Sequence, residues 1–485
     1  MKVVIVGGGT SSWMSAAALA KTFPEYDITV IKGGDPIGVG ESTTPHINQY
    51  LKYMGIDDVT FLREARATYK SSSRFVDFSE FGEVFHYPNG QIPEGNYDEW
   101  MLAKAYGQEV PPFADTYMPF VTIAEEGKLP LDHPFIPNYE LGKDRAFHMD
   151  GESFSTYLKK TFCENVKVIE SDVKSVSYSD KGVAFVTIER GETDLRAPKV
   201  ESDLFIDCTG QRSMLGGAQS SWIDYETILT DTALVVKKEY EDKDKQMVPY
   251  TNAQATSAGW SWTIPTWDYI SRGYVYSSKH QDVDGAFEEF GEKDVTEIHF
   301  RNGRYEEAWV GNCVKIGLSY GFIEPLESTS LFNTHHGILA LMDILSEEPG
   351  INQFARDRFN NNLAEHMDGW KEFVEAHYYY SRRNDTAFWR DVTSQKYDLK
   401  DTDHDYIQYH MSGGDPSYSY EVKPILYILA GSGYTIVGKR RYEHLGVPPV
   451  PESRIRELNE GYQTRKELAS ALPTMYKYLK GTIFS

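Results

Sequence analysis

The sequence predicts an α/β fold that begins with a nucleotide-binding βαβ unit, and four features of the N-terminus carry this prediction. Residues 2–6 predict a strand, and its residues 3–6 are all apolar and β-branched, as expected of a strand that is buried on both faces. A glycine-rich turn at residues 7–9 follows, and the alanine-rich segment after it predicts a helix over residues 13–21. A second strand is expected over residues 27–31. In such a unit a pyrophosphate binds over the turn, at the N-terminus of the helix.

The turn itself supplies the first candidate cofactor contacts. Gly7 permits the tight turn, and Gly9 leaves room for a pyrophosphate beside the backbone. The expected contacts are Gly7, Gly9, Thr10, Ser11, Ser12 and Trp13. Two positions depart from the G-x-G-x-x-G pattern: Ser12 replaces the third glycine, and Lys32 stands where an acidic residue would bind the ribose. Asp35 is a candidate replacement for that acid.

A later strand is expected to return to the nucleotide. The apolar residues 204–206 lead into Asp207, and Gly210 follows three residues later. An acidic residue and a glycine at a strand end approach the cofactor in many folds that have one glycine turn. The alternative is an ordinary strand end with no ligand.

Composition excludes several classes of function. The 485 residues carry a formal net charge of −23, which argues against nucleic acid or an anionic membrane surface as a partner. The three cysteines form no C-x-x-C pair, so neither a disulfide framework nor a zinc site is expected. The first residues already belong to the predicted strand, so we expect no signal peptide, and no apolar run is long enough to span a membrane. We expect a soluble cytoplasmic enzyme.

The remaining chain alternates between helical and strand patterns. Helical spacing of apolar residues predicts helices within residues 46–80, 331–346 and 353–380. Residues 166–189 and 230–280 have the alternation of antiparallel strands. The last hundred residues look mostly helical.

Two runs are the most specific motifs of the chain: W-x-W-x-I-P at residues 260–265 and E-P-L-E-S-T at residues 324–329. Further characteristic segments are residues 7–13, 38–43, 69–75, 147–150, 207–210 and 377–389. Taken together, these motifs resemble those of flavin-dependent halogenases of the tryptophan-halogenase type, and the resemblance runs nearly end to end.

The resemblance implies a fold and a reaction. The fold is an FAD-binding Rossmann-like domain of the glutathione-reductase type, with an inserted β-sheet and a mostly helical C-terminal substrate region. Residues 1–350 would form the FAD-binding and halide-oxidation module, with substrate-side insertions at about 46–140, and residues 351–485 the helical substrate-binding region. Reduced FAD, supplied by a separate flavin reductase, would react with oxygen to a C4a-hydroperoxide. A halide ion would attack it, and the hypohalous acid would travel to a lysine that halogenates a small aromatic substrate.

The same resemblance assigns residues to roles. Lys70 matches the lysine that receives hypohalous acid, and Glu327 matches a glutamate that assists proton removal. The remaining implied sites are Gly40 and Glu41 for the cofactor, Thr329 and Ser330 for the halide, and Trp260, Trp262 and Pro265 as a shield beside the flavin. Without the resemblance, Lys70 is expected to be a solvated lysine on a helix, and the two tryptophans are expected to be core residues. The run at residues 327–330 also reads as a helix cap.

Other activities remain open on the residues alone. A flavin aromatic hydroxylase would use much of the same machinery. The run Gly317-Leu318-Ser319-Tyr320-Gly321 fits the G-x-S-x-G pattern of a hydrolase, although a hydrolase would leave the nucleotide turn unexplained. The pair His335-His336 and the acidic run 401–405 lack metal-site spacing, so no metal is expected. The identity of the aromatic substrate and the preferred halide are not set by the sequence.

Overall fold

The chain folds as two compact units, each assembled from three stretches of sequence. The computed structural model describes residues 1–34, 38, 40–90, 96–131, 144–189, 198–347, 350–397, 425–433 and 438–485. Unit 1 comprises Met1–Ala67, Met149–Glu226 and His299–Lys371. Unit 2 comprises Thr68–His148, Thr227–Ile298 and Glu372–Ser485.

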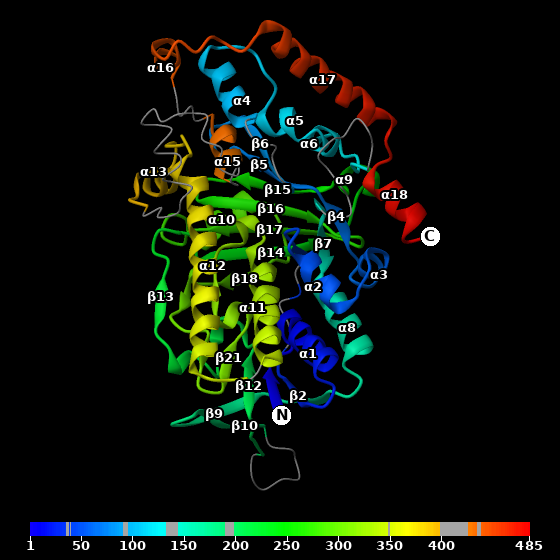
Figure 1. Cartoon of the computed structure of the whole chain (residues 1–485), viewed down its shortest axis with the longest axis vertical. Helices are drawn as coiled ribbons and strands as arrows, with labels where there is room; N and C mark the ends of the chain where they lie inside the picture. Colours follow the sequence, from blue (N-terminus) through cyan, green and yellow to red (C-terminus); the bar gives the residue numbers. More distant parts are fainter. Residues whose placement is uncertain are drawn as a thin grey trace. The chain divides into compact units, whose positions relative to one another are not determined.

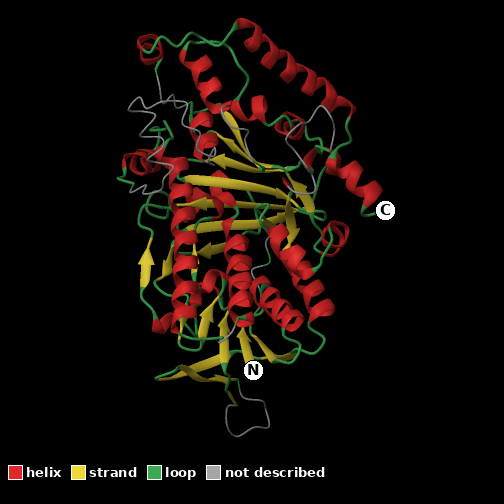
Figure 2. Ribbon diagram, in the orientation of Figure 1, coloured by secondary structure: helices red, strands yellow, loops and turns green. Residues whose placement is uncertain are grey.

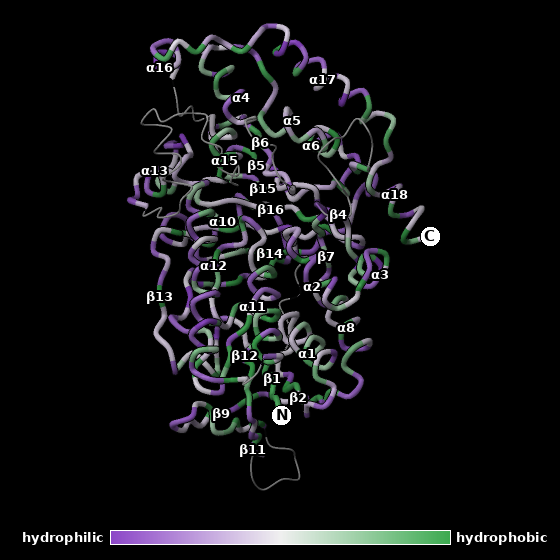
Figure 3. The backbone as a smooth tube through the Cα atoms, viewed as in Figure 1, coloured by the Kyte–Doolittle hydropathy of each residue, from purple (hydrophilic) through white to green (hydrophobic). Residues whose placement is uncertain are grey.

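A six-stranded sheet forms the centre of unit 1, with strand order β20-β21-β12-β1-β2-β8. Its strands are β1 (Lys2–Val6), β2 (Asp27–Lys32), β8 (Lys167–Glu170), β12 (Leu204–Asp207), β20 (Trp309–Val310) and β21 (Cys313–Lys315). Neighbouring strands are parallel, except in the edge pair β20–β21. The central strand β1 is buried from Val3 to Val6 and is coloured hydrophobic in Figure 3. A parallel strand between two covering layers needs apolar residues on both faces.

Helices cover one face of this sheet, and a small antiparallel sheet covers the other. The helices α1 (Thr10–Thr22), α8 (Gly151–Phe162) and α11 (Thr329–Ser346) pack together (Figure 1). The small sheet consists of β9 (Val173–Ser179), β10 (Gly182–Ile188) and β11 (Lys199–Val200). Val4 and Val6 of β1 share a buried cluster with Val183 and Val186 of β10. The N-terminal βαβ unit predicted from the sequence is therefore confirmed.

A seven-stranded sheet organises unit 2, with strand order β18-β14-β17-β16-β15-β5-β6 (Figure 2, yellow arrows). Its strands are β5 (Ser72–Val76), β6 (Val84–Pro88), β14 (Thr232–Lys238), β15 (Tyr250–Ala255), β16 (Gly259–Pro265), β17 (Ile270–Tyr276) and β18 (Thr296–His299). The pair β15–β5 is parallel, whereas β14–β17, β17–β16, β16–β15 and β5–β6 are antiparallel. A short strand, β4 (Thr68–Lys70), pairs antiparallel with β7 (Ala146–Asp150).

The helical expectation for residues 46–80 is only half right. Helices α2 (Ile47–Met54) and α3 (Asp58–Glu64) form as expected, but the chain then enters strands β4 and β5. Arg66 has φ +49°, a left-handed conformation that ends the helical segment. Pairing with β7 and β15 then decides the extended state of the residues that follow.

The described C-terminal segments are helical, as expected. They form α12 (Gln353–Tyr379), α13 (Ala387–Ser394), α15 (Ile425–Gly431), α16 (Lys439–His444), α17 (Glu452–Ala471) and α18 (Met475–Thr482). The acidic run at residues 401–405 lies outside the described residues. Among the described helices, none combines the length and the apolar character that a membrane crossing requires.

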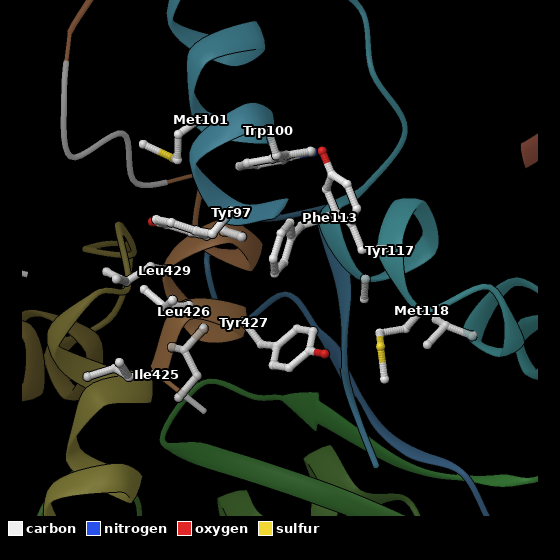
Figure 4. Close-up of a cluster of buried hydrophobic side chains, with 14 of the residues drawn as sticks. Tyr97, Trp100, Met101, Phe113, Tyr117, Met118, Ile425, Leu426, Tyr427 and Leu429 are labelled. Atoms are coloured by element: carbon white, nitrogen blue, oxygen red, sulfur yellow. The ribbon is translucent and has the colours of Figure 1, made fainter. Parts of the chain in front are cut away.

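Aromatic side chains join several helices of unit 2. Figure 4 shows Tyr97 and Trp100 of α4 (Asn96–Ala105) facing Phe113 of α5 (Phe113–Tyr117) and Tyr427 of α15. The ring centroid of Phe113 lies 5.5 Å from that of Tyr97, 5.6 Å from that of Trp100 and 5.4 Å from that of Tyr427. These rings fill the interior of the helical layer, where offset and edge-to-face contacts add to burial.

Candidate active site

The glycine turn between β1 and α1 has two glycines packed against protein and one that faces open space. Gly7 has φ +138°, and a Cβ there would lie 2.3 Å from the carbonyl oxygen of Cys208. A Cβ on Gly8 would lie 2.7 Å from the Cγ atom of Lys32. A Cβ on Gly9 would meet no described atom within 4 Å. Gly9 is therefore the position at which a pyrophosphate can approach the backbone.

The first turn of α1 presents backbone N–H groups without a side-chain cap. Gly9 is the N-cap residue, and the first turn contains no acidic residue. Trp13 braces the turn, because its indole N–H donates to the carbonyl of Gly8 at 3.2 Å. Ser12, in place of the third glycine, is fully buried, and Ser11 is half-buried beside it. The helix thus offers a positive dipole end that suits an anionic group.

Glu41 lies next to this helix start, on β3 (Gly40–Ser42). Thr10 donates through its hydroxyl to Glu41 Oε1 at 3.1 Å. Burial raises the pKa of Glu41 to about 7, and the charge of Asp150 adds to this rise, while the Thr10 hydrogen bond opposes it. A carboxyl group whose pKa is this high can be neutral beside a phosphate. Asp35, the candidate replacement for an acid at Lys32, lies outside the described residues.

Asp207 shapes the loop that follows β12. Its buried carboxylate accepts hydrogen bonds from the backbone N–H and hydroxyl of Thr209, at 3.0 and 2.7 Å. It also accepts from the backbone N–H groups of Leu215 and Gly216, at 2.7 and 2.9 Å. Gly210 lies inside this loop, and a Cβ there would meet no described atom within 4 Å. Gly210 is therefore the open position of the loop, and Asp207 fixes its conformation.

The segment that precedes α11 brings a buried carboxylate and a helix start together. Glu327, which is 3% exposed, lies in a 3₁₀ turn directly before the N-cap residue Ser328. Residues 327–330 do lie at the start of α11, as expected of a helix cap, but the N-cap residue Ser328 has φ +59° and makes no side-chain cap bond. Thr329 is fully buried, and its hydroxyl has no hydrogen-bond partner among the described residues. Together with the N–H of half-buried Ser330, this helix start suits a small anion.

The two helix starts of unit 1 are connected through Gly317. A Cβ on Gly317 would lie 2.9 Å from the hydroxyl oxygen of Thr334 on α11 and 3.3 Å from Cβ of Ser11 on α1. The residues expected to bind the cofactor and those expected to bind the halide therefore belong to one packed body.

Lys70 is a buried strand residue of unit 2, with 3% of its surface exposed. The carbonyl of Lys70 accepts from the side-chain amide of Asn89 at 2.8 Å, which fixes the backbone of β4 at this point. His148 on β7 is fully buried, and its burial and the charge of Lys70 hold the pKa of His148 well below its ordinary value. The alternative that Lys70 is a solvated helix lysine is therefore wrong.

Both tryptophans of the W-x-W-x-I-P run lie on β16 and are buried. Trp260 is 1% exposed and Trp262 is 7% exposed, and their ring centroids are 6.0 Å apart. The indole of Trp262 covers Gly273 on β17, because a Cβ at Gly273 would lie 2.1 Å from the ring. At the end of the strand, the carbonyl of Pro265 accepts from the hydroxyl of Thr68 at 2.6 Å, which ties β16 to β4.

Comparison with known proteins decides the family. The model of the tryptophan halogenase family matches residues 2–432. The chain belongs to the tryptophan halogenase family. It is 30% identical to tryptophan 6-halogenase SttH of Streptomyces toxytricini, over 98% of this chain and 97% of that protein. It is 31% identical to tryptophan 7-halogenase RebH of Lentzea aerocolonigenes, over 80% of this chain and 78% of that protein.

Solved structures agree with this assignment. The flavin-dependent halogenase BrvH from Brevundimonas sp. BAL3 superimposes with a TM-score of 0.83 at 29% identity, over 99% of this chain and 98% of that one. The FAD-binding Rossmann-like fold with a helical C-terminal region, expected from the resemblance, is thereby confirmed. The chain is an enzyme of a flavin-dependent family that halogenates aromatic substrates.

Membership of the halogenase family removes the hydrolase alternative, and the geometry agrees. Ser319 of the G-x-S-x-G run lies in a 3₁₀ turn, fully buried, and its hydroxyl has no hydrogen-bond partner among the described residues. A nucleophilic serine needs a base within hydrogen-bond reach and access to substrate. No cluster of described His, Cys, Asp and Glu residues could hold a metal ion.

Sequence reasoning missed the surroundings of Lys70. Thr68, His148 and Thr251 form a buried polar group beside Lys70, yet they come from three separate segments of the chain. The run at residues 147–150 had matched the family, but nothing in its pattern linked His148 to Lys70. The link comes from the pairing of β4 with β7, which joins residues 80 positions apart.

Proposed function

We propose that this enzyme uses reduced FAD, oxygen and a halide to form hypohalous acid, which Lys70 receives and transfers to an electron-rich aromatic substrate. The observation that carries the proposal is the burial of Lys70 beside an uncharged imidazole. A lysine that is removed from water loses its proton more readily, so its amine can react with the oxidant or hold it by a hydrogen bond.

The residues of unit 1 fit the cofactor and the halide. Gly9 and the uncapped start of α1 suit a pyrophosphate, so we propose FAD in preference to FMN. When bound, reduced FAD would supply the activation of oxygen and the oxidation of halide. Thr329 and Ser330 would bind the halide ion through the start of α11. Glu327 would accept the proton that the aromatic ring releases.

Other parts of the proposal concern organisation and partners. Residues 1–350 would carry FAD binding and halide oxidation, with insertions at about 46–140, and residues 351–485 would bind the substrate. A separate flavin reductase would supply reduced FAD, and the enzyme would act in the cytoplasm. Trp260, Trp262 and Pro265 would keep the aromatic substrate away from the flavin.

Replacement of Lys70 tests the proposal. We expect Lys70→Ala to abolish halogenation of an aromatic panel while FAD binding and reoxidation of reduced FAD continue, because the lysine acts after oxygen has been activated. Glu327→Gln should reduce turnover less than Lys70→Ala does, because it keeps size and hydrogen bonding but loses the base. Product is measured by mass spectrometry and flavin reoxidation by stopped-flow absorbance.

A lysine variant elsewhere in the same unit controls for charge and stability. Lys293 is exposed, so Lys293→Ala should halogenate as the unmodified enzyme does. Normal halogenation by Lys70→Ala would refute the assignment of the lysine.

A further inference from the structure

One face of the β4–β7 pair carries Lys70 together with other polar side chains. Thr68 lies directly opposite His148, and Lys70 lies opposite Ala146. Because side chains alternate along a strand, Thr68 and Lys70 share one face with His148 and Ala146. Lys70 is thus the diagonal neighbour of His148, a relation that long side chains can span, and the small side chain of Ala146 leaves room between them.

The opposite face of the same pair is aromatic. Tyr69 stacks on Phe147 with ring centroids 5.7 Å apart. All four residues of the face that carries Lys70 are buried as well, so its polar side chains lie inside the protein and not in solvent.

Hydrogen-bond directions fix the protonation of His148. The hydroxyl of Thr68 donates its single proton to the carbonyl of Pro265 at 2.6 Å. Thr68 Oγ1 can therefore only accept from Nδ1 of His148, 3.4 Å away, so Nδ1 carries the proton. Because burial and the charge of Lys70 keep this ring neutral, Nε2 is bare and accepts from the hydroxyl of Thr251 at 2.8 Å. The chain of bonds runs in one direction, from Thr251 through His148 and Thr68 to Pro265, and the backbone carbonyl of Pro265 also accepts directly from His148.

We infer that His148 is a positioning residue for Lys70: held as the Nδ1–H tautomer between Thr68 and Thr251, it fixes the lysine relative to the end of the two-tryptophan strand. The inference rests on the proposed function of Lys70. This role acts through the lysine and needs no contact between His148 and the substrate. It sets where the lysine amine lies, and it places an uncharged ring beside an amine that must be able to lose its proton.

Isosteric and conservative substitutions separate positioning from simple stability. His148→Leu removes both ring nitrogens, and Thr68→Val removes the hydroxyl that accepts from His148 and donates to Pro265. Each should lower the yield of bromoindole per reduced FAD oxidised by about tenfold or more, with indole and bromide as probes, because displacement of a reacting group is costly. The rate of reduced-FAD oxidation should stay the same. Thr68→Ser and His148→Asn each keep a donor at the required place and should restore most of the yield.

Three controls make the result decisive. Thr232→Val removes another buried threonine hydroxyl, on β14, and should leave the yield unchanged. Melting temperatures identify variants that lose yield because they unfold. In unmodified enzyme with ¹⁵N-labelled histidine, the imidazole signals absent from His148→Asn should show a protonated Nδ1 and a bare Nε2, without titration between about pH 6 and 8.

The outcomes distinguish this inference from the proposed function. An accepted aromatic of the panel replaces indole as the probe if indole is not brominated. If unmodified enzyme brominates no member of the panel, or if Lys70→Ala brominates the probe equally well, the proposed function fails and the inference fails with it. If bromination needs Lys70 but folded Thr68→Val and His148→Leu keep the full yield, the positioning role of His148 is refuted alone. An Nε2–H tautomer or a charged imidazole at neutral pH would also refute it.

Discussion

Glu41 carries a charge that opposes folding of the FAD-free enzyme. Its pKa in the folded chain is about 7, against an ordinary value of 4.5, and burial is the main cause. A raised pKa means that the folded state holds the proton more tightly than the unfolded state does. The contribution of this bound proton to the free energy of unfolding is complete below about pH 4.5, and it is lost as the pH rises through about 7. Each tenfold difference in proton affinity between the two states corresponds to about 1.4 kcal/mol.

Removal of this ionisation should therefore stabilise the enzyme in alkaline buffer only. Glu41→Gln keeps an oxygen that can accept from Thr10, so its melting temperature should exceed that of unmodified enzyme at about pH 8 and equal it near pH 4.5. Scanning calorimetry of FAD-free protein measures both. Glu64→Gln, at an exposed acid of the same unit, should show no such pH dependence. A gain from Glu41→Gln that is the same at both pH values would contradict this role of the carboxyl group.

Two glycines of the N-terminal turn should respond in opposite ways to alanine. Gly7→Ala forces a Cβ against the carbonyl of Cys208 at φ +138°, so it should destabilise the fold by about 1–3 kcal/mol or more. Gly9→Ala has space and an ordinary backbone, so it should fold normally but bind FAD more weakly. Chemical denaturation and FAD titration separate the two effects. Unchanged FAD affinity in Gly9→Ala would place the pyrophosphate elsewhere.

The structural role of a single residue could be predicted from the sequence only where its immediate neighbours in the chain determine that role. The turn at Gly7 and Gly9 follows from a strand, a glycine run and a helix within twenty-odd residues, and the structure has that order. The position of His148 beside Lys70 could not be predicted, because strand register between distant segments creates it. Family resemblance identified Lys70, whereas the residues that surround it needed coordinates.

At the scale of elements, strands β16 and β17 pack tightly where the indole of Trp262 lies over Gly273. These two residues are directly paired, and any side chain at Gly273 would collide with the indole. Gly273→Ala should therefore destabilise the enzyme by about 1–3 kcal/mol, the usual cost of overpacking. The same substitution in a Trp262→Ala background should cost much less, because the indole is gone.

A double-mutant cycle by denaturant unfolding measures this coupling. Additive effects of Gly273→Ala and Trp262→Ala would show that the indole can move aside without cost. The strand assignment of Trp260 and Trp262 was predictable from their alternation, but the glycine that receives Trp262 lies on another strand and was not. Tertiary pairing likewise overrode the helical pattern expected at β4 and β5.

At the scale of the whole molecule, the residues of the proposed reaction are distributed between two compact units. The nucleotide turn, Glu327 and the start of α11 belong to unit 1, whereas Lys70 and the two tryptophans belong to unit 2. The order of these motifs along the sequence was enough to identify the family, and no distance in space between them was needed. The division into units was not predictable, because each unit collects three separated stretches of chain, and long-range pairing alone defines them.

The most direct test of the central claim is the halide dependence of the organic product. A panel of electron-rich aromatics is supplied with reduced FAD and oxygen, with chloride, with bromide and without halide, and the products are analysed by mass spectrometry. If the oxidant leaves the flavin as hypohalous acid, halogenated product requires halide, and its omission yields hydrogen peroxide with no oxygenated aromatic. A hydroxylase would behave in the opposite way. Gain of one oxygen by the aromatic in the absence of halide would contradict the proposed reaction and leave Trp260 and Trp262 as core residues alone.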